Sequence, residues 1–160
     1  MPINHDLTMK FELMTKEECI DFIEFNITGD SENYNKCDDE SLYLNSNLFN
    51  IFAGCFERSN HLFEFFGQTM YNSRKFIPLQ NELNDNLEKL LAINNFDEFQ
   101  TYVTGIFMGR ELINQINQND PEYKKHWRSY IRRWIRINRG LTKLINKCIE
   151  EERVLWVIGY

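Results

Sequence analysis

The chain has 160 residues and a formal net charge of −6, and hydrophobic residues make up 42% of it, a proportion that excludes a disordered chain. This length favours one domain over residues 1–160 with a core of its own. Seven glycines and three prolines leave few turn signals, which favours long helices over many short strands. Neither an apolar run of about 18 residues nor a leader pattern is present, so we expect no membrane span and no secretory signal.

Charge is distributed unevenly along the chain. Residues 1–60 carry 12 acidic and 4 basic side chains, residues 61–120 carry 8 and 4, and residues 121–160 carry 4 and 10. The three balances are therefore −8, −4 and +6. An acidic body followed by a basic C-terminal segment indicates a charged partner.

The first half of the sequence predicts three helices. The first begins at a capping box, Thr15-Lys16-Glu17-Glu18, and ends at Gly29, with an apolar face made of Cys19, Phe22, Ile23 and Ile27. A polar loop over residues 29–41 separates it from a second helix over about 41–57. The third begins near Ser59 or Asn60 and stops before Pro78, because the residue before a proline disfavours helical geometry.

The second half predicts three more helices. The fourth begins at Pro78 and ends at Asn94 and Asn95, and the fifth runs from about Phe96 to Asn117. Two glycines four residues apart inside the fifth, Gly105 and Gly109, predict a close helix crossing. Asp120-Pro121-Glu122 predicts the start of the last helix, whose apolar seam is Trp127, Tyr130, Trp134, Ile137, Leu141, Leu144 and Cys148. Residues 154–158 are apolar enough to fold back on the core. The expected fold is an all-α, single-domain bundle of about six helices with a long C-terminal helix.

An acidic loop (residues 29–41) is the first candidate site. It carries five carboxylates, namely Asp30, Glu32, Asp38, Asp39 and Glu40, with Lys36 as its only basic residue. A calcium loop starting at Asp30 would need an oxygen ligand at position 34 and a glycine at position 35, and the chain has Tyr34 and Asn35 there. A solvated loop and a recognition surface for a basic protein both remain open.

A basic row on the last predicted helix is the second candidate site. It consists of Arg128, Arg132, Arg136, Arg139, Lys143 and Lys147, spaced by three or four residues. Like charges at this spacing destabilise a helix, so the row calls for neutralisation. Three alternatives for this neutralisation remain open: the acidic half of the same molecule, nucleic-acid phosphates, and simple solvation. The net charge of −6 weighs against general nucleic-acid binding.

Residues with catalytic or metal-binding potential follow no known pattern. Cys19, Cys37, Cys55 and Cys148 form no CxxC pair, and His5, His61 and His126 lie in unrelated segments. HExxH, GxSxG and glycine-rich phosphate loops are absent from the sequence. We therefore expect reduced thiols, a cytoplasmic location, no metal site, no cofactor and no enzymatic activity.

In size, acidity and absence of catalytic motifs, the chain resembles the small immunity proteins of bacterial contact-dependent inhibition and polymorphic toxin systems. The resemblance carries no motif and transfers no functional residue. It implies a non-enzymatic inhibitor that binds a basic toxin domain, often a nuclease, and occludes its active site or substrate surface. The alternative is a helical nucleic-acid-binding protein that uses Arg128, Arg132, Arg136, Arg139 and Lys143. The oligomeric state is left open.

Overall fold

The computed structural model describes residues 12–16 and 21–160. Its elements are β1 (Phe22–Asn26), β2 (Leu42–Asn45), α1 (Ser46–Ser59), β3 (Gln68–Tyr71), α2 (Ser73–Leu91), α3 (Phe96–Thr104), α4 (Gly109–Asn119), α5 (Trp127–Glu150) and β4 (Leu155–Gly159). The described part of the chain is thus a mixed α/β structure with five α-helices and one four-stranded sheet. A search of these described residues finds no helix that could span a membrane.

The sheet brings together strands from distant parts of the sequence. Its order is β2-β1-β4-β3, and each neighbouring pair is antiparallel. In β1, which pairs with both β2 and β4, Ile23 lies opposite Gly159. Because side chains alternate along a strand, Ile23 and Phe25 point to the core while Glu24 and Asn26 lie on the opposite face.

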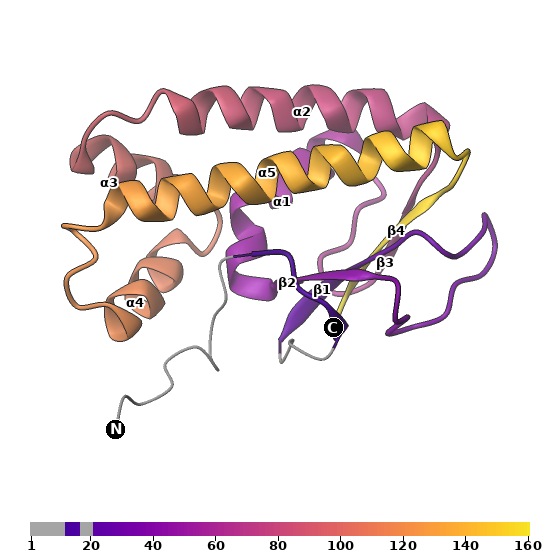
Figure 1. Cartoon of the computed structure of the whole chain (residues 1–160), viewed down its shortest axis with the longest axis horizontal. Coiled ribbons are helices and arrows are strands. Elements are labelled where there is room, and N and C mark those ends of the chain that lie inside the picture. The colour runs from indigo at the N-terminus through magenta and orange to yellow at the C-terminus, as the bar shows by residue number, and fades with distance from the viewer. Residues whose placement is uncertain (1–11, 17–20) are drawn as a thin grey trace.

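The helices form the rest of the molecule. α2 and α5 run side by side along its long axis, with α3 and α4 at one end and the sheet toward the other (Figure 1). α1 packs against α2 and against β1 and β2. As a result, α1 is buried around almost its whole circumference, through Leu48, Phe49, Asn50, Ile51, Phe52, Ala53, Cys55 and Phe56.

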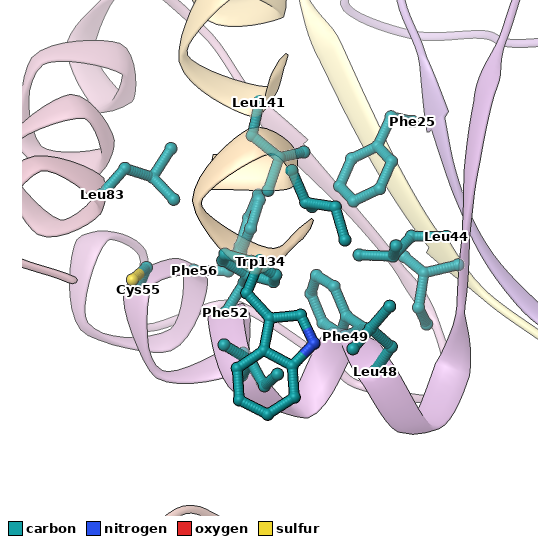
Figure 2. Close-up of a cluster of buried hydrophobic side chains, with 14 of the residues drawn as sticks. Phe25, Leu44, Leu48, Phe49, Phe52, Cys55, Phe56, Leu83, Trp134 and Leu141 are labelled. Atoms are coloured by element: carbon teal, nitrogen blue, oxygen red, sulfur yellow. The ribbon is translucent and has the colours of Figure 1, made fainter. Parts of the chain in front are cut away.

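The core is built around α1. Figure 2 shows side chains from the sheet, α1, α2 and α5 meeting there, among them Phe25, Leu44, Leu83, Trp134 and Leu141. Trp134 is completely buried and stacks on Phe99, with ring centroids 5.4 Å apart. Its central place in the seam of the last helix is confirmed.

The predicted all-α fold is wrong, because four segments expected in helices or in a tail form a sheet. The helix expected between Thr15 and Gly29 is replaced over Phe22–Asn26 by β1, while residues 17–20, which include Glu17 and Glu18 of the capping box, lie outside the described residues. The sequence from Phe22 to Asn26 fits both a helical and an alternating pattern. Pairing with β2 and β4 decides between them, because strand stability depends on cross-strand neighbours.

Two further helix boundaries are corrected. The second expected helix loses its first residues to β2 and begins at Ser46, behind an Asn45 cap. The third is replaced by a connection and β3, after which α2 begins at Ser73 and continues through Pro78. Proline has no N–H, so the carbonyl one helical turn before Pro78 lacks its usual donor. Pro78 is exposed, so water can hydrate that carbonyl instead.

The fifth expected helix is interrupted. α3 ends at Thr104 and α4 begins at Gly109, so the glycines lie at the junction and mediate no helix crossing. A Cβ at Gly109 would lie 1.9 Å from the carbonyl oxygen of Val103, which leaves no room for a side chain. The preceding Met108 has a positive φ of 59°. The single helix expected from Phe96 to Asn117 is therefore two helices, α3 and α4, joined by a tight turn.

The prediction for the C-terminal segment is largely confirmed. α5 spans Trp127–Glu150 and buries its seam from Tyr130 to Cys148. It starts later than Asp120-Pro121-Glu122 indicated, because residues 121–126 form turns. Residues 154–158 do fold back on the core, as part of β4.

Candidate functional site

The acidic loop lies in the connection from β1 to β2. It is found at the sheet end of the molecule, away from α3 and α4 (Figure 1). The loop covers the face of the sheet opposite to the core: the Tyr34 and Trp156 rings are 4.8 Å apart, and Cys37 Sγ lies 3.8 Å from the Tyr160 hydroxyl. Sheet side chains beneath the loop can therefore hold its backbone in place.

Glu24 is the central anchor, fully buried beneath the loop. Its Oε1 accepts hydrogen bonds from the Cys37 N–H and the Tyr160 hydroxyl, both at 2.8 Å. Its Oε2 accepts from the Ser41 hydroxyl at 2.7 Å and the Asp38 N–H at 3.2 Å. A buried carboxylate is costly unless it is hydrogen-bonded, and four donors satisfy this one. Three of them, from Cys37, Asp38 and Ser41, tie the second half of the loop to β1. Burial of the hydroxyl and its bond to Glu24 raise the pKa of Tyr160.

Asn26 anchors the first half of the loop in the same way. This buried side chain accepts hydrogen bonds at Oδ1 from the N–H groups of Thr28 at 3.1 Å and Gly29 at 3.0 Å. Its Nδ2 donates to the carbonyl of Asn35 at 3.0 Å. Two residues of β1, two positions apart, thus fix both halves of the loop.

The first two carboxylates lie in a turn held by Trp156, whose Nε1 donates to the Asp30 carbonyl at 2.8 Å. The Asp30 carboxylate accepts the N–H groups of Glu32 at 2.8 Å and Asn33 at 2.7 Å. These two backbone hydrogen bonds lower the pKa of Asp30. Asp30 and Glu32 are both exposed, so the turn presents two carboxylates to solvent.

The other three carboxylates lie in a second turn. Asp38 is half-buried and accepts the Glu40 N–H at 2.8 Å. Asp39 and Glu40 are exposed, and Asp39 forms an ion pair with Lys16 at 3.3 Å. The described residues include no group of three or more His, Cys, Asp or Glu placed to hold a metal. The five predicted residues therefore form two separate turns on one ordered loop.

Sequence reasoning missed the residues that hold this loop: Glu24, Asn26, Ser41 and Tyr160. The available signal was the alternation of Ile23 and Phe25 with Glu24 and Asn26, which is typical of a strand with one polar face. The partner of Glu24 at position 160 is 136 residues away along the chain. No local pattern connects positions so far apart.

The basic face of α5 consists of Arg128, Arg132, Arg136, Arg139 and Lys143, all exposed. Arg128 lies over the Trp127 ring, 4.9 Å from its centroid. None of the ion pairs within residues 12–16 and 21–160 includes any of these five side chains. The described acidic residues therefore do not neutralise the face by direct pairing, and it spans about 22 Å along the helix.

The buried thiols are poor nucleophiles. Burial raises the pKa of Cys55 to about 12 and that of Cys148 to about 11. Both thiols are consequently protonated at neutral pH, and a thiol reacts mainly as its thiolate.

Comparison of the chain with protein-family models, with curated proteins and with solved structures finds no match. The acidic loop and the basic face of α5 are therefore judged as candidate sites from their geometry alone.

Proposed function

We propose that this protein is a non-enzymatic inhibitor that acts in the cytoplasm and binds a basic protein through its acidic loop. The observation that carries the proposal is the anchoring of the loop by Glu24, whose carboxylate accepts four hydrogen bonds. An ordered loop loses less conformational entropy on binding than a flexible one. Its carboxylates then meet the partner from defined positions.

The partner that fits this loop is a toxin domain that binds nucleic acid, such as a nuclease. Such a domain presents lysine and arginine side chains to phosphates, and the exposed carboxylates of Glu32, Asp39 and Glu40 can take the place of those phosphates. Clustered charges of opposite sign also raise the rate of encounter. Inhibition then follows from occlusion of the surface that binds the substrate.

The test uses a triple variant of the second turn, Asp38→Asn, Asp39→Asn and Glu40→Gln. Its association with the partner recovered by co-purification is measured by surface plasmon resonance at low and high salt. We expect slower association at low salt, and a difference from the wild type that disappears at high salt because salt screens the exposed charges.

The matched control removes three exposed carboxylates on α2 and α5: Asp85→Asn, Glu88→Gln and Glu150→Gln. Both triple variants have the same net charge, so a general charge effect slows both equally. Equal association rates for the two variants would exclude the acidic loop as the binding site.

A second candidate function is nucleic-acid binding by the basic face of α5. It is favoured by the exposure of Arg132, Arg136 and Arg139 without ion pairs to described residues. Fluorescence polarisation with duplex and single-stranded DNA at several salt concentrations tests it. Each phosphate contact adds about 0.7–0.9 to the slope of the logarithm of affinity against the logarithm of salt concentration. Replacing Arg132, Arg136 and Arg139 together with Gln should remove up to about three contacts, so this slope should become shallower. A flat salt dependence in the wild type would eliminate this candidate.

A further inference from the structure

A hollow of about 200 Å³ lies where α5 begins, beside the connection from α2 to α3 (Figure 1). The described residues that line it are Ile93, Asn94, Trp127, Arg128, Ile131 and Arg132. Two of these, Arg128 and Arg132, also belong to the basic face of α5. The hollow is therefore one end of that face, and the acidic loop contributes nothing to it.

Two arginines of the hollow are available to an anion. The Arg128 guanidinium lies over the Trp127 ring, 4.9 Å from the ring centroid. Such a contact holds the cation in place without neutralising its charge, because the ring carries no net charge. Neither Arg128 nor Arg132 forms an ion pair with a described residue. A phosphate is the anion that suits them, since a guanidinium can bind it through two parallel hydrogen bonds.

The other charges near the hollow do not oppose a phosphate. The described lining residues include no acidic side chain. The Glu98 carboxylate accepts the Asn94 N–H at 2.8 Å, but Glu98 is not part of the lining. Asn94 is exposed, and its side-chain amide can both donate and accept hydrogen bonds, as the edge of a nucleobase requires.

The wall of the hollow is apolar, a feature that a phosphate alone does not need. Ile131 is buried, and Ile93 and Trp127 are half-buried. Unpaired bases pack on aromatic side chains and on guanidinium planes, whereas the bases of a duplex are covered by their neighbours. A volume of about 200 Å³ is smaller than the roughly 300–1,000 Å³ of sites for drug-sized molecules, which suits a single base.

Building on nucleic-acid binding by the basic face of α5, we propose that this hollow holds one unpaired nucleotide of a single-stranded nucleic acid. The base packs against Trp127 and Ile131, and Arg128 and Arg132 bind the phosphates beside it. Arg136 lies about one helical turn beyond Arg132, so the next phosphates can follow the same face of α5. The phosphates bind along the face, and the base makes the site selective for a single strand over a duplex.

Three labelled DNA probes with equal numbers of phosphates test the proposal on the intact chain by fluorescence polarisation: an oligothymidylate, an abasic strand and a duplex. We expect the oligothymidylate to bind at least about fivefold more tightly than the abasic strand, the effect of one stacked base. The duplex should bind no better than the abasic strand, because its bases are covered.

Three variants, each checked for a cooperative unfolding transition, assign this preference to the hollow. Trp127→Leu should remove the preference and leave the affinity for the abasic strand, which depends on phosphates. Trp127→Phe keeps an aromatic ring and should retain the preference. Arg136→Gln with Arg139→Gln changes the basic face outside the hollow. This variant should weaken the binding of all three probes and leave their ratios unchanged.

The outcomes separate the hollow from the basic face. Equal binding of the oligothymidylate and the abasic strand, or a preference that survives in Trp127→Leu, would overturn the nucleotide site and leave nucleic-acid binding by the face standing. Failure of all three probes to bind would overturn both. Thymidine monophosphate should compete only at concentrations far above those of the oligothymidylate. Competition at equal concentration would identify a free nucleotide as the ligand and overturn the proposed strand.

Discussion

The Tyr160 hydroxyl donates a 2.8 Å hydrogen bond to Glu24 Oε1, joining two residues 136 positions apart. Glu24 accepts the N–H groups of Cys37 and Asp38 as well. The strand pairing of β1 with β4 thus also sets the position of the acidic loop. The Glu24 carboxylate that holds the acidic loop is therefore also held by the C-terminal end of the chain, next to β4.

Replacing Glu24 with Gln should destabilise the fold and release the loop. An amide keeps the size of the carboxylate but turns one acceptor into a donor that faces other donors. We expect a loss of about 1.5–3 kcal/mol in the free energy of unfolding, the range for hydrogen bonds to a charged group. Urea unfolding measures this loss, and hydrogen exchange should accelerate across residues 29–41. Glu40→Gln, at an exposed position of the same loop, should change stability by less than about 0.5 kcal/mol. Equal stabilities for the two variants would refute the anchoring role.

Truncating Trp134 should cost about 3–5 kcal/mol, as is usual for a core aromatic residue. The side chain is completely buried and stacks on Phe99. Denaturant unfolding of Trp134→Ala measures the loss. Trp127→Ala, in the same seam but half-buried, serves as the control and should cost less. A loss below about 1 kcal/mol at Trp134 would contradict its place in the core.

Removing charge from the basic face of α5 should stabilise the helix slightly. Arg132 and Arg136 are exposed, lie four residues apart, and have no ion pair with described residues. Arg132→Gln with Arg136→Gln should therefore raise stability by about 0.2–0.5 kcal/mol at low salt. At about 1 M salt the gain should vanish, because the screening length falls to about 3 Å.

The control for this prediction is Arg58→Gln, which removes the ion pair with Glu82 at 2.8 Å. Its effect should have the opposite sign, a loss of up to about 1 kcal/mol. Thermal or denaturant unfolding in both salt conditions measures all three proteins. Destabilisation by the Arg132 and Arg136 changes would indicate that the face is neutralised within the molecule.

Asp120 should contribute to the acid sensitivity of the fold. Burial pushes the pKa of Asp120 upward, but hydrogen bonds from His126 at 2.8 Å and Tyr130 at 2.9 Å outweigh it, so the pKa is lowered from 3.8. A group with a lowered folded-state pKa stabilises the fold above its unfolded pKa, and this contribution is lost as the pH falls through the folded value.

Asp120→Asn should accordingly be less stable than the wild type near neutral pH, and the two should converge as the pH falls below the folded-state pKa of Asp120. Urea unfolding as a function of pH measures the difference. Asp85→Asn, at an exposed position, should follow the wild-type profile throughout. A constant gap between Asp120→Asn and the wild type at every pH would show that titration of Asp120 contributes nothing.

Local patterns predicted the helices best where the apolar period was long. The seam of α5 runs through six turns, so its 3.6-residue period left little ambiguity. The strands have only four or five residues each, and such short apolar segments fit either period. The break between α3 and α4 was not predicted, because the helical pattern of the sequence is continuous there. The break comes with a close approach of Gly109 to Val103, which local periodicity does not report.

The sequence by itself determined the acidic loop, the basic row and the buried position of Trp134, because these depend on residue type and on local spacing. Only the tertiary structure decided that Phe22–Asn26 is a strand, that Glu24 is buried beneath the acidic loop and that the basic face of α5 stays free of ion pairs with described residues. The physical reason is that strand pairing and the burial of a carboxylate are set by partners distant in sequence, such as Tyr160.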